Sequence, residues 1–259
     1  MKRRFTLAAA LTFAVGCSSS ASSEELTVFA AASLTEAFEA IIEDFEREHV
    51  GVDVRVSFAG SNSLRTQIEN GARADVFASA NPKHLRALED QRLAMLATVF
   101  ATNQMVVAVP EDNPAHIEIF DHLPKAERIV LAGSEVPAGA YAQKIIGRAA
   151  SSLGPQFSAA VMKQVVSREN DVRATLQKVV LGEADAALVY ETDAAAADVS
   201  AVEIPSDLNV RASYPIAPLA EGDRALAQRF VSFVTSLRGQ ETLERFGFGL
   251  PSEGMSASR

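Results

Sequence analysis

The chain has 259 residues, of which 24 are lysine or arginine and 33 are aspartate or glutamate, giving a formal net charge of −9. So negative a chain is a poor candidate for binding nucleic acid, whose phosphates it would repel. Its single cysteine excludes an intrachain disulfide, and the 48% of hydrophobic residues suffices for one large domain or two modest ones.

The first 23 residues have the pattern of a secretory signal followed by a tether. Basic residues at 2–4 precede an apolar run at 5–15, which is too short to span a membrane comfortably, and small or hydroxyl residues follow. We therefore exclude residues 1–23 from the fold. We expect the mature protein outside the cytoplasm, in the periplasm or an equivalent extracytoplasmic compartment.

Cys17 lies near the end of this segment, in the sequence Ala14-Val15-Gly16-Cys17. This sequence resembles a bacterial lipobox, although Ala14 stands where leucine is usual. The resemblance implies that Cys17 is lipidated and anchors the protein to a membrane. The alternative is ordinary cleavage near residues 19–21, which would discard Cys17 with the signal.

The first predicted elements are a strand at 26–30 and a helix that follows through two alanines. Helical spacing of Leu34, Phe38, Ile41, Ile42 and Phe45 gives that helix one apolar face. Ser33 precedes this face and Glu36 follows three residues later, which predicts a capping box. A helix start of this kind can also bind an anion, because its backbone N–H groups point outward. Ser33 is therefore either a helix cap alone or part of an anion site.

Strands and helices are predicted to alternate along the rest of the chain. The expected strands are 52–58, 75–79, 105–109, 129–132, 165–166, 186–190 and 199–204, and residues 210–219 are expected to be extended. The expected helices are one ending at Asn70, one beginning at Pro82, and 137–150, 172–181 and 224–237, the last with Leu226, Phe230, Phe233, Val234 and Leu237 inward. This alternation predicts an α/β fold with mostly parallel sheets, which bind ligands at the carboxyl ends of their strands.

Four helix starts share one design, in which a strand leads through small or polar residues into a helix. They are Ser33, 60–63, 137–139 and 170–172, and Tyr190 adds a phenol hydroxyl at the end of a further strand. Their hydroxyl and backbone N–H groups are neutral donors, which suit a fully ionised tetrahedral oxyanion because every oxygen can accept a hydrogen bond. Arg65 and Arg173, one turn into two of these helices, are expected to be solvated.

Five stretches carry a resemblance to a known family: TVFAAASLTEAF, VSFAGSNSLRTQIENGARADVFASA, VPAGAYA, ENDVRATL and ALVYETDA. In this order, and over essentially the whole mature chain, they resemble the periplasmic molybdate-binding proteins of ABC importers. The resemblance implies a type II periplasmic binding protein fold, with two α/β lobes that close over the anion. It places the first lobe at about 24–103 plus 214–259 and the second at about 104–213.

The same resemblance implies the ligands of the anion. They would be the hydroxyls of Ser33, Ser61 and Tyr190 and the backbone N–H groups of Ala138 and Val172, so that the metal is held through the oxygens of molybdate. The family often has a further serine where this chain has Asn62, whose amide can also donate. The resemblance further implies a monomer that has no cofactor and delivers molybdate to the permease of an importer. Tungstate is expected to bind as well, because it has nearly the same size and charge.

Two other classes of function remain as alternatives. A secreted hydrolase would need a base beside Ser33 or Ser61, but the four histidines are scattered, and His49 and His84 are expected at the surface. Within the binding class, the competing ligands are tungstate, sulfate, phosphate and organic anions. Hydrogenphosphate would favour a carboxylate acceptor, which Asp171, Glu191 or Asp193 could supply. Glu191 and Asp193 could also bind the metal directly, although they are more simply the acidic start of a helix.

Overall fold

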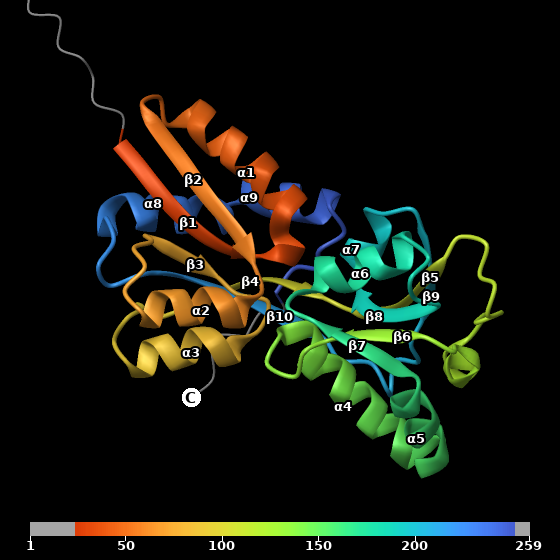
Figure 1. The fold of residues 1–259 in the computed structure, drawn as a ribbon. Coiled ribbons are helices and arrows are strands. Elements are labelled where there is room, and N and C mark those ends of the chain that lie inside the picture. The colour runs from red at the N-terminus through yellow and green to blue at the C-terminus, as the bar shows by residue number, and fades with distance from the viewer. Residues whose placement is uncertain (1–23, 252–259) are drawn as a thin grey trace, which may run out of the picture.

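The structure is a computed structural model that describes residues 24–251, so the predicted signal segment and Cys17 lie outside the described residues. The described chain forms two α/β lobes, and each lobe has one five-stranded sheet with helices on both faces (Figure 1). This is the α/β architecture that the alternating pattern predicts. Within residues 24–251 no helix is both long and apolar enough to cross a membrane.

The first lobe contains both ends of the described chain. Its strands are β1 (Glu24–Ala31), β2 (Val52–Ala59), β3 (Val76–Ala78), β4 (Thr98–Asn103) and β10 (Ala212–Pro218). Its helices are the 3-10 turn η1 (Ala32–Leu34), α1 (Thr35–Glu48), α2 (Ser61–Glu69), α3 (Pro82–Asp90), α8 (Arg224–Val234) and α9 (Leu237–Arg245).

The second lobe is built from the middle of the chain. Its strands are β5 (Met105–Pro110), β6 (Ile129–Ala132), β7 (Val165–Glu169), β8 (Ala186–Tyr190) and β9 (Val199–Glu203). Its helices are η2 (Phe120–Lys125), α4 (Pro137–Ser152), α5 (Pro155–Lys163), α6 (Val172–Val180) and α7 (Glu191–Ala195). The predicted strands 129–132 and 186–190 are observed with those bounds.

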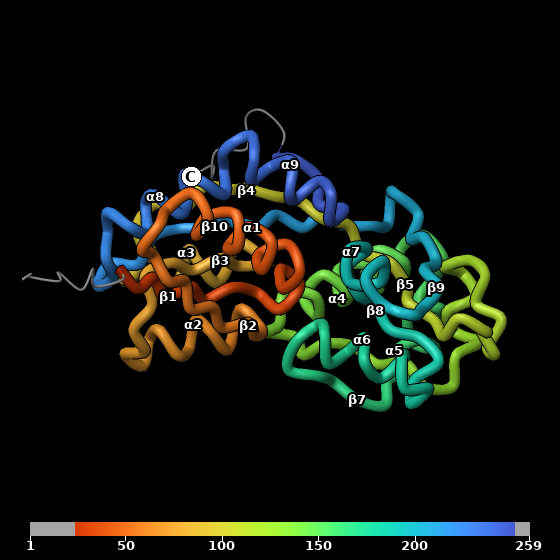
Figure 2. The backbone as a smooth tube through the Cα atoms, turned by 90° about the horizontal axis from the view of Figure 1, so that it is seen from above, coloured from red at the N-terminus to blue at the C-terminus, as the bar shows by residue number. Residues whose placement is uncertain are grey.

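The two sheets have the same topology. Their strand orders are β2-β1-β3-β10-β4 and β7-β6-β8-β5-β9. In each sheet three neighbouring strands are parallel, and the fourth, β10 or β5, is antiparallel to both of its neighbours. That antiparallel strand is the one that the chain enters just after crossing from the other lobe (Figure 2). It starts at the interface between the lobes and therefore runs opposite to the parallel strands, which end there.

The chain crosses between the lobes twice. β4 and β5 are separated by Gln104 alone, and residues 204–211 connect β9 to β10. All of β10, from Ala212 onward, pairs within the first sheet. The lobe limits of 103 and 214 stay a prediction.

The core of the first lobe confirms the predicted apolar face of α1. The rings of Phe38 and Phe45 on this helix pack edge-on against Phe230 of α8, at centroid distances of 6.2 and 5.1 Å. All three side chains are fully buried. The helical spacing of the apolar residues thus identifies the packed face correctly.

The helix predicted over 224–237 is shorter than expected. α8 ends at Val234, and the side chain of Ser236 accepts a hydrogen bond from the N–H of Gly239 and caps a separate helix, α9. Leu237 therefore leaves the apolar face and is 78% exposed, so its predicted inward position is wrong. The helices α5 and α9 and the strand β4 have no counterpart among the predicted elements.

Candidate functional site

A small cavity lies between the lobes, where the parallel strands of both sheets end. It has a volume of about 10 Å³ and is lined by Ala31, Ala32, Ser33, Ala59, Gly60, Ser61, Ala80, Val136, Pro137, Ala138, Asp171, Val172 and Tyr190. All five predicted ligand residues line it. Ser33 and Ser61 come from the first lobe and the other three come from the second, so the cavity is complete only when the lobes are together.

Ser33 lies in the 3-10 turn η1, which leads directly into α1. It makes no capping hydrogen bond, and its Oγ is instead 3.1 Å from the hydroxyl of Tyr214 on β10. Glu36 does not reach back to Ser33 but forms an ion pair with Arg173 in the second lobe. The predicted capping box is therefore wrong, because both side chains have partners distant in the sequence.

Ser61 is the first residue of α2, after Gly60 at the N-cap position. Its Oγ accepts a hydrogen bond from the backbone N–H of Ala80, at 3.0 Å, beyond the end of β3. A hydroxyl that accepts one hydrogen bond keeps its own proton free to donate. Ser61 thus offers a donor to the cavity and does not cap its helix.

Ala138 and Val172 lie in the first turns of α4 and α6, where backbone N–H groups have no partner within the helix. Asp171 caps α6 by accepting from the N–H of Ala174 at 2.8 Å, so the cap is directed at Ala174 and not at the N–H of Val172. At Gly139 a Cβ atom would lie 2.0 Å from the carbonyl oxygen of Gly133. Only glycine therefore allows α4 to begin this close to the end of β6.

Tyr190 is the last residue of β8 and is 1% exposed. Burial raises the pKa of its hydroxyl well above the ordinary value, so the group is a neutral donor. Among the described residues this hydroxyl has no hydrogen-bond partner. A buried polar group without a partner costs about 1–3 kcal/mol, so the orphaned hydroxyl indicates that a ligand belongs here.

Of the three acidic residues considered as acceptors, only Asp171 lines the cavity. Its Oδ1 accepts from the N–H of Ala174 and caps α6. Asp193 is fully buried outside the cavity lining and lies 2.9 Å from the Nε of Arg173. Burial raises the pKa of Asp193 to about 7, against the attraction of Arg173. The prediction that Arg173 is solvated is therefore wrong, since its guanidinium bridges Asp193 and Glu36.

The family model of the bacterial extracellular solute-binding proteins matches residues 26–249. The chain belongs to this family. The molybdate-binding protein ModA of Mycobacterium tuberculosis strain H37Rv is 38% identical over 231 residues, 87% of this chain and 85% of that protein. ModA of Escherichia coli K12 is 34% identical over 253 residues, 93% of this chain and 95% of that protein.

Among solved structures, the periplasmic molybdate-binding protein of Azotobacter vinelandii matches this solute-binding protein with a TM-score of 0.77 and 21% identity, over 88% of this chain and all of the other. This likeness, with the two mixed sheets, confirms the predicted type II periplasmic binding protein fold. The membership of a family of extracellular solute-binding proteins also agrees with the predicted class of function.

The solute-binding protein is in a closed conformation, because several groups of the two lobes are in direct contact. The ammonium of Lys83 lies 2.8 Å from the carboxylate of Glu135, and Glu36 pairs with Arg173. At Gly60 an added Cβ would lie 2.5 Å from the carbonyl oxygen of Asn170 in the other lobe. The sequence gives no local signal of these contacts, which join residues far apart in the chain.

His84 contributes a buried contact between the lobes. It is fully buried, and its Nε2 lies 2.9 Å from the carbonyl oxygen of Glu135, so the ring donates to that carbonyl. Burial, with a smaller effect of the Arg65 charge, lowers the pKa of His84 to about 4. The prediction that His84 lies at the surface is wrong. Its ring contacts the opposite lobe and is not among the residues that line the cavity.

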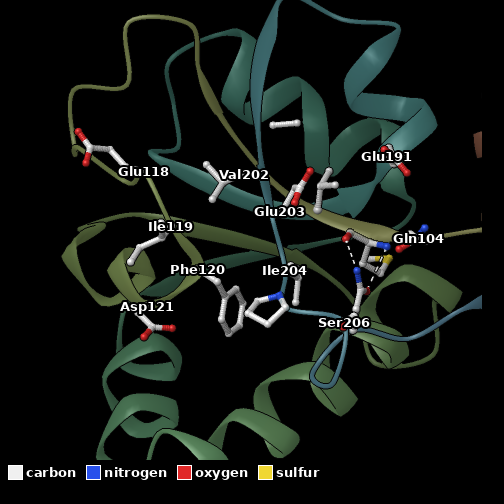
Figure 3. A pocket seen from close by; sticks show the side chains of 15 residues that line it. Gln104, Glu118, Ile119, Phe120, Asp121, Glu191, Val202, Glu203, Ile204 and Ser206 are labelled. Carbon is white, nitrogen blue, oxygen red and sulfur yellow. Dashed lines mark hydrogen bonds between the residues drawn. The ribbon is translucent and has the colours of Figure 1, made fainter.

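A larger cavity lies on the second lobe (Figure 3), and none of the five predicted ligand residues lines it. The carboxylates of Glu118, Asp121, Glu191 and Glu203 line it, and no lysine or arginine is among its lining residues. Such a cavity repels a dianion. The smaller cavity between the lobes is therefore the candidate anion site of this solute-binding protein.

Proposed function

We propose that this chain is an extracytoplasmic solute-binding protein that captures molybdate in the cavity between its lobes and delivers it to the permease of an ABC importer. The observation that carries the proposal is the set of neutral donors from both lobes around one cavity, with the orphaned Tyr190 hydroxyl among them. The two ModA relatives, 34% and 38% identical over most of the chain, support molybdate as the ligand.

The proposed ligand atoms are the hydroxyls of Ser33, Ser61 and Tyr190 and the N–H groups of Ala138 and Val172. These groups donate and carry no charge, so they suit an anion whose oxygens all accept. The positive ends of α4 and α6 add to the attraction. Molybdenum itself would touch only its own oxygens, and tungstate would bind in the same way.

The same donor set disfavours hydrogenphosphate, because its proton needs an acceptor. Of the three carboxylates considered for this role, Glu191 and Asp193 lie outside the cavity lining, and Asp171 has one of its two carboxylate oxygens engaged as a helix cap. The cavity volume of about 10 Å³ is far below the roughly 300–1,000 Å³ that is usual for drug-sized ligands, so in this closed conformation the cavity excludes organic ligands of that size.

Delivery requires that the lobes separate, since the proposed ligand atoms come from both. The lobe limits that we propose are 24–103 with 214–259 and 104–213, joined by the two crossings. We propose that the protein acts as a monomer outside the cytoplasm, tethered through a lipid on Cys17. Cys17→Ser should release it from the membrane fraction or block its processing, and mass spectrometry finding a mature N-terminus after Cys17 would refute the anchor.

Calorimetry of the purified protein against molybdate, tungstate, sulfate and phosphate tests the ligand. Ligand at a hundred times its dissociation constant should stabilise the fold by about 2.7 kcal/mol, so thermal unfolding should shift upward with molybdate and tungstate. It should hardly shift with sulfate or phosphate. An equal shift with sulfate would make the protein a general oxyanion binder, and no shift with any of the four would refute the proposal.

A further inference from the structure

His84 is a buried titratable residue between the lobes that does not belong to the proposed ligand set. It lies in the first turn of α3 and has an exposed fraction of 0%. The start of α3 in the first lobe lies against the loop that precedes α4 in the second lobe (Figure 1), and the Nε2 of His84 is 2.9 Å from the carbonyl oxygen of Glu135 in that loop. Because the two residues belong to different lobes, opening of the protein breaks this contact.

The contact joins two walls of the cavity. Ala80, just before α3, lines the cavity and donates its N–H to the Ser61 Oγ. Val136, which directly follows Glu135, lines the cavity from the second lobe and leads into α4. The hydrogen bond between His84 and Glu135 therefore holds the walls together close to the proposed ligand atoms, although His84 itself does not line the cavity.

The closed geometry admits only the neutral ring of His84. A carbonyl oxygen can only accept, so Nε2 carries a hydrogen and donates it to Glu135. The other ring nitrogen, Nδ1, is buried and has no hydrogen-bond partner within residues 24–251. In the neutral ring Nδ1 carries a lone pair. In the protonated ring it would be a charged donor without an acceptor, and burial of such a group is strongly unfavourable.

The surroundings of His84 also favour the neutral ring. Burial is the main cause that lowers its pKa to about 4, and the positive charges of Arg65 on α2 and Lys83 on α3 act in the same direction. The carbonyl and carboxylate of Glu135 raise the pKa, but this carboxylate is paired with Lys83 at 2.8 Å. β10, which also packs on α3, has no charged residue, and the hydroxyl of its one titratable side chain, Tyr214, is hydrogen-bonded to a serine.

We propose that His84 is a positioning residue that joins the two walls of the cavity only as the neutral ring, so that closure over the anion releases a proton from the open form. The inference rests on the proposed function. With the lobes apart the ring meets water, and its pKa returns toward the ordinary value of 6.5. On closure the imidazolium gives one proton to solvent and donates its remaining N–H to Glu135. The open form holds more protons than the closed form below about pH 6.5, so anion affinity is complete above that pH and falls as the pH falls toward 4.

The first measurement is calorimetry of molybdate binding to the parent as a function of pH. With a pKa of 6.5 in the open form and about 4 in the closed form, the dissociation constant should rise about tenfold from about pH 7.5 to about pH 5.5. At about pH 6.5, His84 should release about half a proton per anion bound, which the dependence of the binding enthalpy on the buffer measures. Buried Asp193, whose pKa is about 7, is present in the parent and in every variant, so the readout is the difference between them.

His84→Gln removes the titrating ring and keeps a donor. Its amide can still donate to the Glu135 carbonyl, so affinity should stay within about threefold of the parent at about pH 7.5, while the tenfold pH dependence and the proton release should be lost. His84→Leu has no donor and should bind about five- to tenfold more weakly at about pH 7.5, again without the pH dependence. Thermal unfolding without ligand at that pH verifies that both variants are folded.

The matched control is His49→Gln. The Nδ1 of His49 lies 2.9 Å from the carbonyl oxygen of Phe45, so this ring also contacts a carbonyl, but within a single helix and its cap in the first lobe. Closure leaves that contact unchanged, and the variant should keep the pH dependence of the parent. A measurement on the parent alone is NMR titration of its four histidine rings, one of which should have a pKa near 6.5 without ligand and below about 5 with molybdate bound.

The outcomes separate the inference from the proposed function. If the parent binds molybdate and His84→Gln keeps its pH dependence and proton release, another group titrates and the inference is overturned. An affinity of the parent that does not change over this range of pH would overturn it as well, because the ring would then stay buried in the ligand-free protein. If the parent binds none of the four anions at any pH, the proposed function itself fails, and the inference falls with it.

Discussion

Gly60 is the point at which the closed conformation can be tested most directly. Its backbone angles, φ −58° and ψ 134°, are accessible to any residue, so alanine introduces no backbone strain. In the closed structure, however, the new Cβ would lie 2.5 Å from the carbonyl oxygen of Asn170 in the other lobe. It would also lie 2.7 Å from the Asn62 Oδ1, a side-chain atom of the same lobe that can rotate away.

The expected effect of Gly60→Ala follows from the distance to the backbone of the second lobe. Ordinary contact begins at 3.4 Å, so the 2.5 Å separation is 0.9 Å too short, and the lobes must move apart by about that much. Val172, whose N–H is a proposed ligand donor, lies two residues after Asn170 and moves with it. A shift of this size lengthens a hydrogen bond of about 2.9 Å beyond useful range. Hydrogen bonds to charged groups contribute about 1.5–3 kcal/mol, so molybdate affinity should fall about ten- to a hundredfold.

Calorimetry with molybdate measures this loss, and thermal unfolding without ligand reports on the fold. The matched control is Gly147→Ala in α4, where an added Cβ meets no atom within 4 Å. That variant should bind like the parent and be more stable by about 0.5–1 kcal/mol, because alanine favours helix. Binding by Gly60→Ala within twofold of the parent would refute the reasoning, since the closed contact would then not be the binding conformation.

Three further predictions concern single side chains. Tyr190→Phe should lower molybdate affinity about ten- to a hundredfold while leaving the ligand-free melting temperature unchanged or higher, because the removed hydroxyl has no protein partner; unchanged affinity in calorimetry would contradict this. Glu36→Gln removes a half-exposed ion pair with Arg173 between the lobes and should weaken binding up to about fivefold, an effect that should shrink when the titration is repeated at high salt. His84 has a folded-state pKa of about 4 against an ordinary 6.5, so its contribution to stability is complete above about pH 6.5 and is lost as the pH falls toward 4. His84→Gln, which can still donate to Glu135, should lose less stability than the parent over this range of pH in thermal unfolding.

The exposed ion pair between Lys83 and Glu135 serves as a control for Glu36→Gln. Both of its side chains are more than half exposed, and such pairs contribute little. Lys83→Met should therefore change molybdate affinity by less than twofold. If Lys83→Met weakens molybdate binding more than Glu36→Gln does, the exposure of an ion pair does not determine how much it contributes to binding.

The sequence by itself determined the alternation of most strands and helices and the helix starts that lie at the cavity. A strand followed by small residues and a helix start is a pattern within one short stretch of sequence. A helix that directly follows a strand begins at the carboxyl end of that strand, which is where α/β sheets bind ligands. This pattern selects the helix starts at Ser33, 60–63, 137–139 and 170–172 and the strand end at Tyr190. The family resemblance narrows them to five residues, all of which line the cavity. Whether each of them binds the anion stays a prediction.

The tertiary structure alone decided what each of these side chains is bonded to. A capping box was a sound reading of Ser33 and Glu36, but buried Tyr214 and the cationic Arg173 compete for these two side chains from distant parts of the chain. The burial of His84 likewise depends on a second lobe that packs over α3. The periodicity of apolar residues indicates which face of a helix or strand is buried. It does not indicate which polar group from another part of the chain will contact that face. Only the closing of two lobes, each stabilised by its own core, brings these partners within hydrogen-bonding distance.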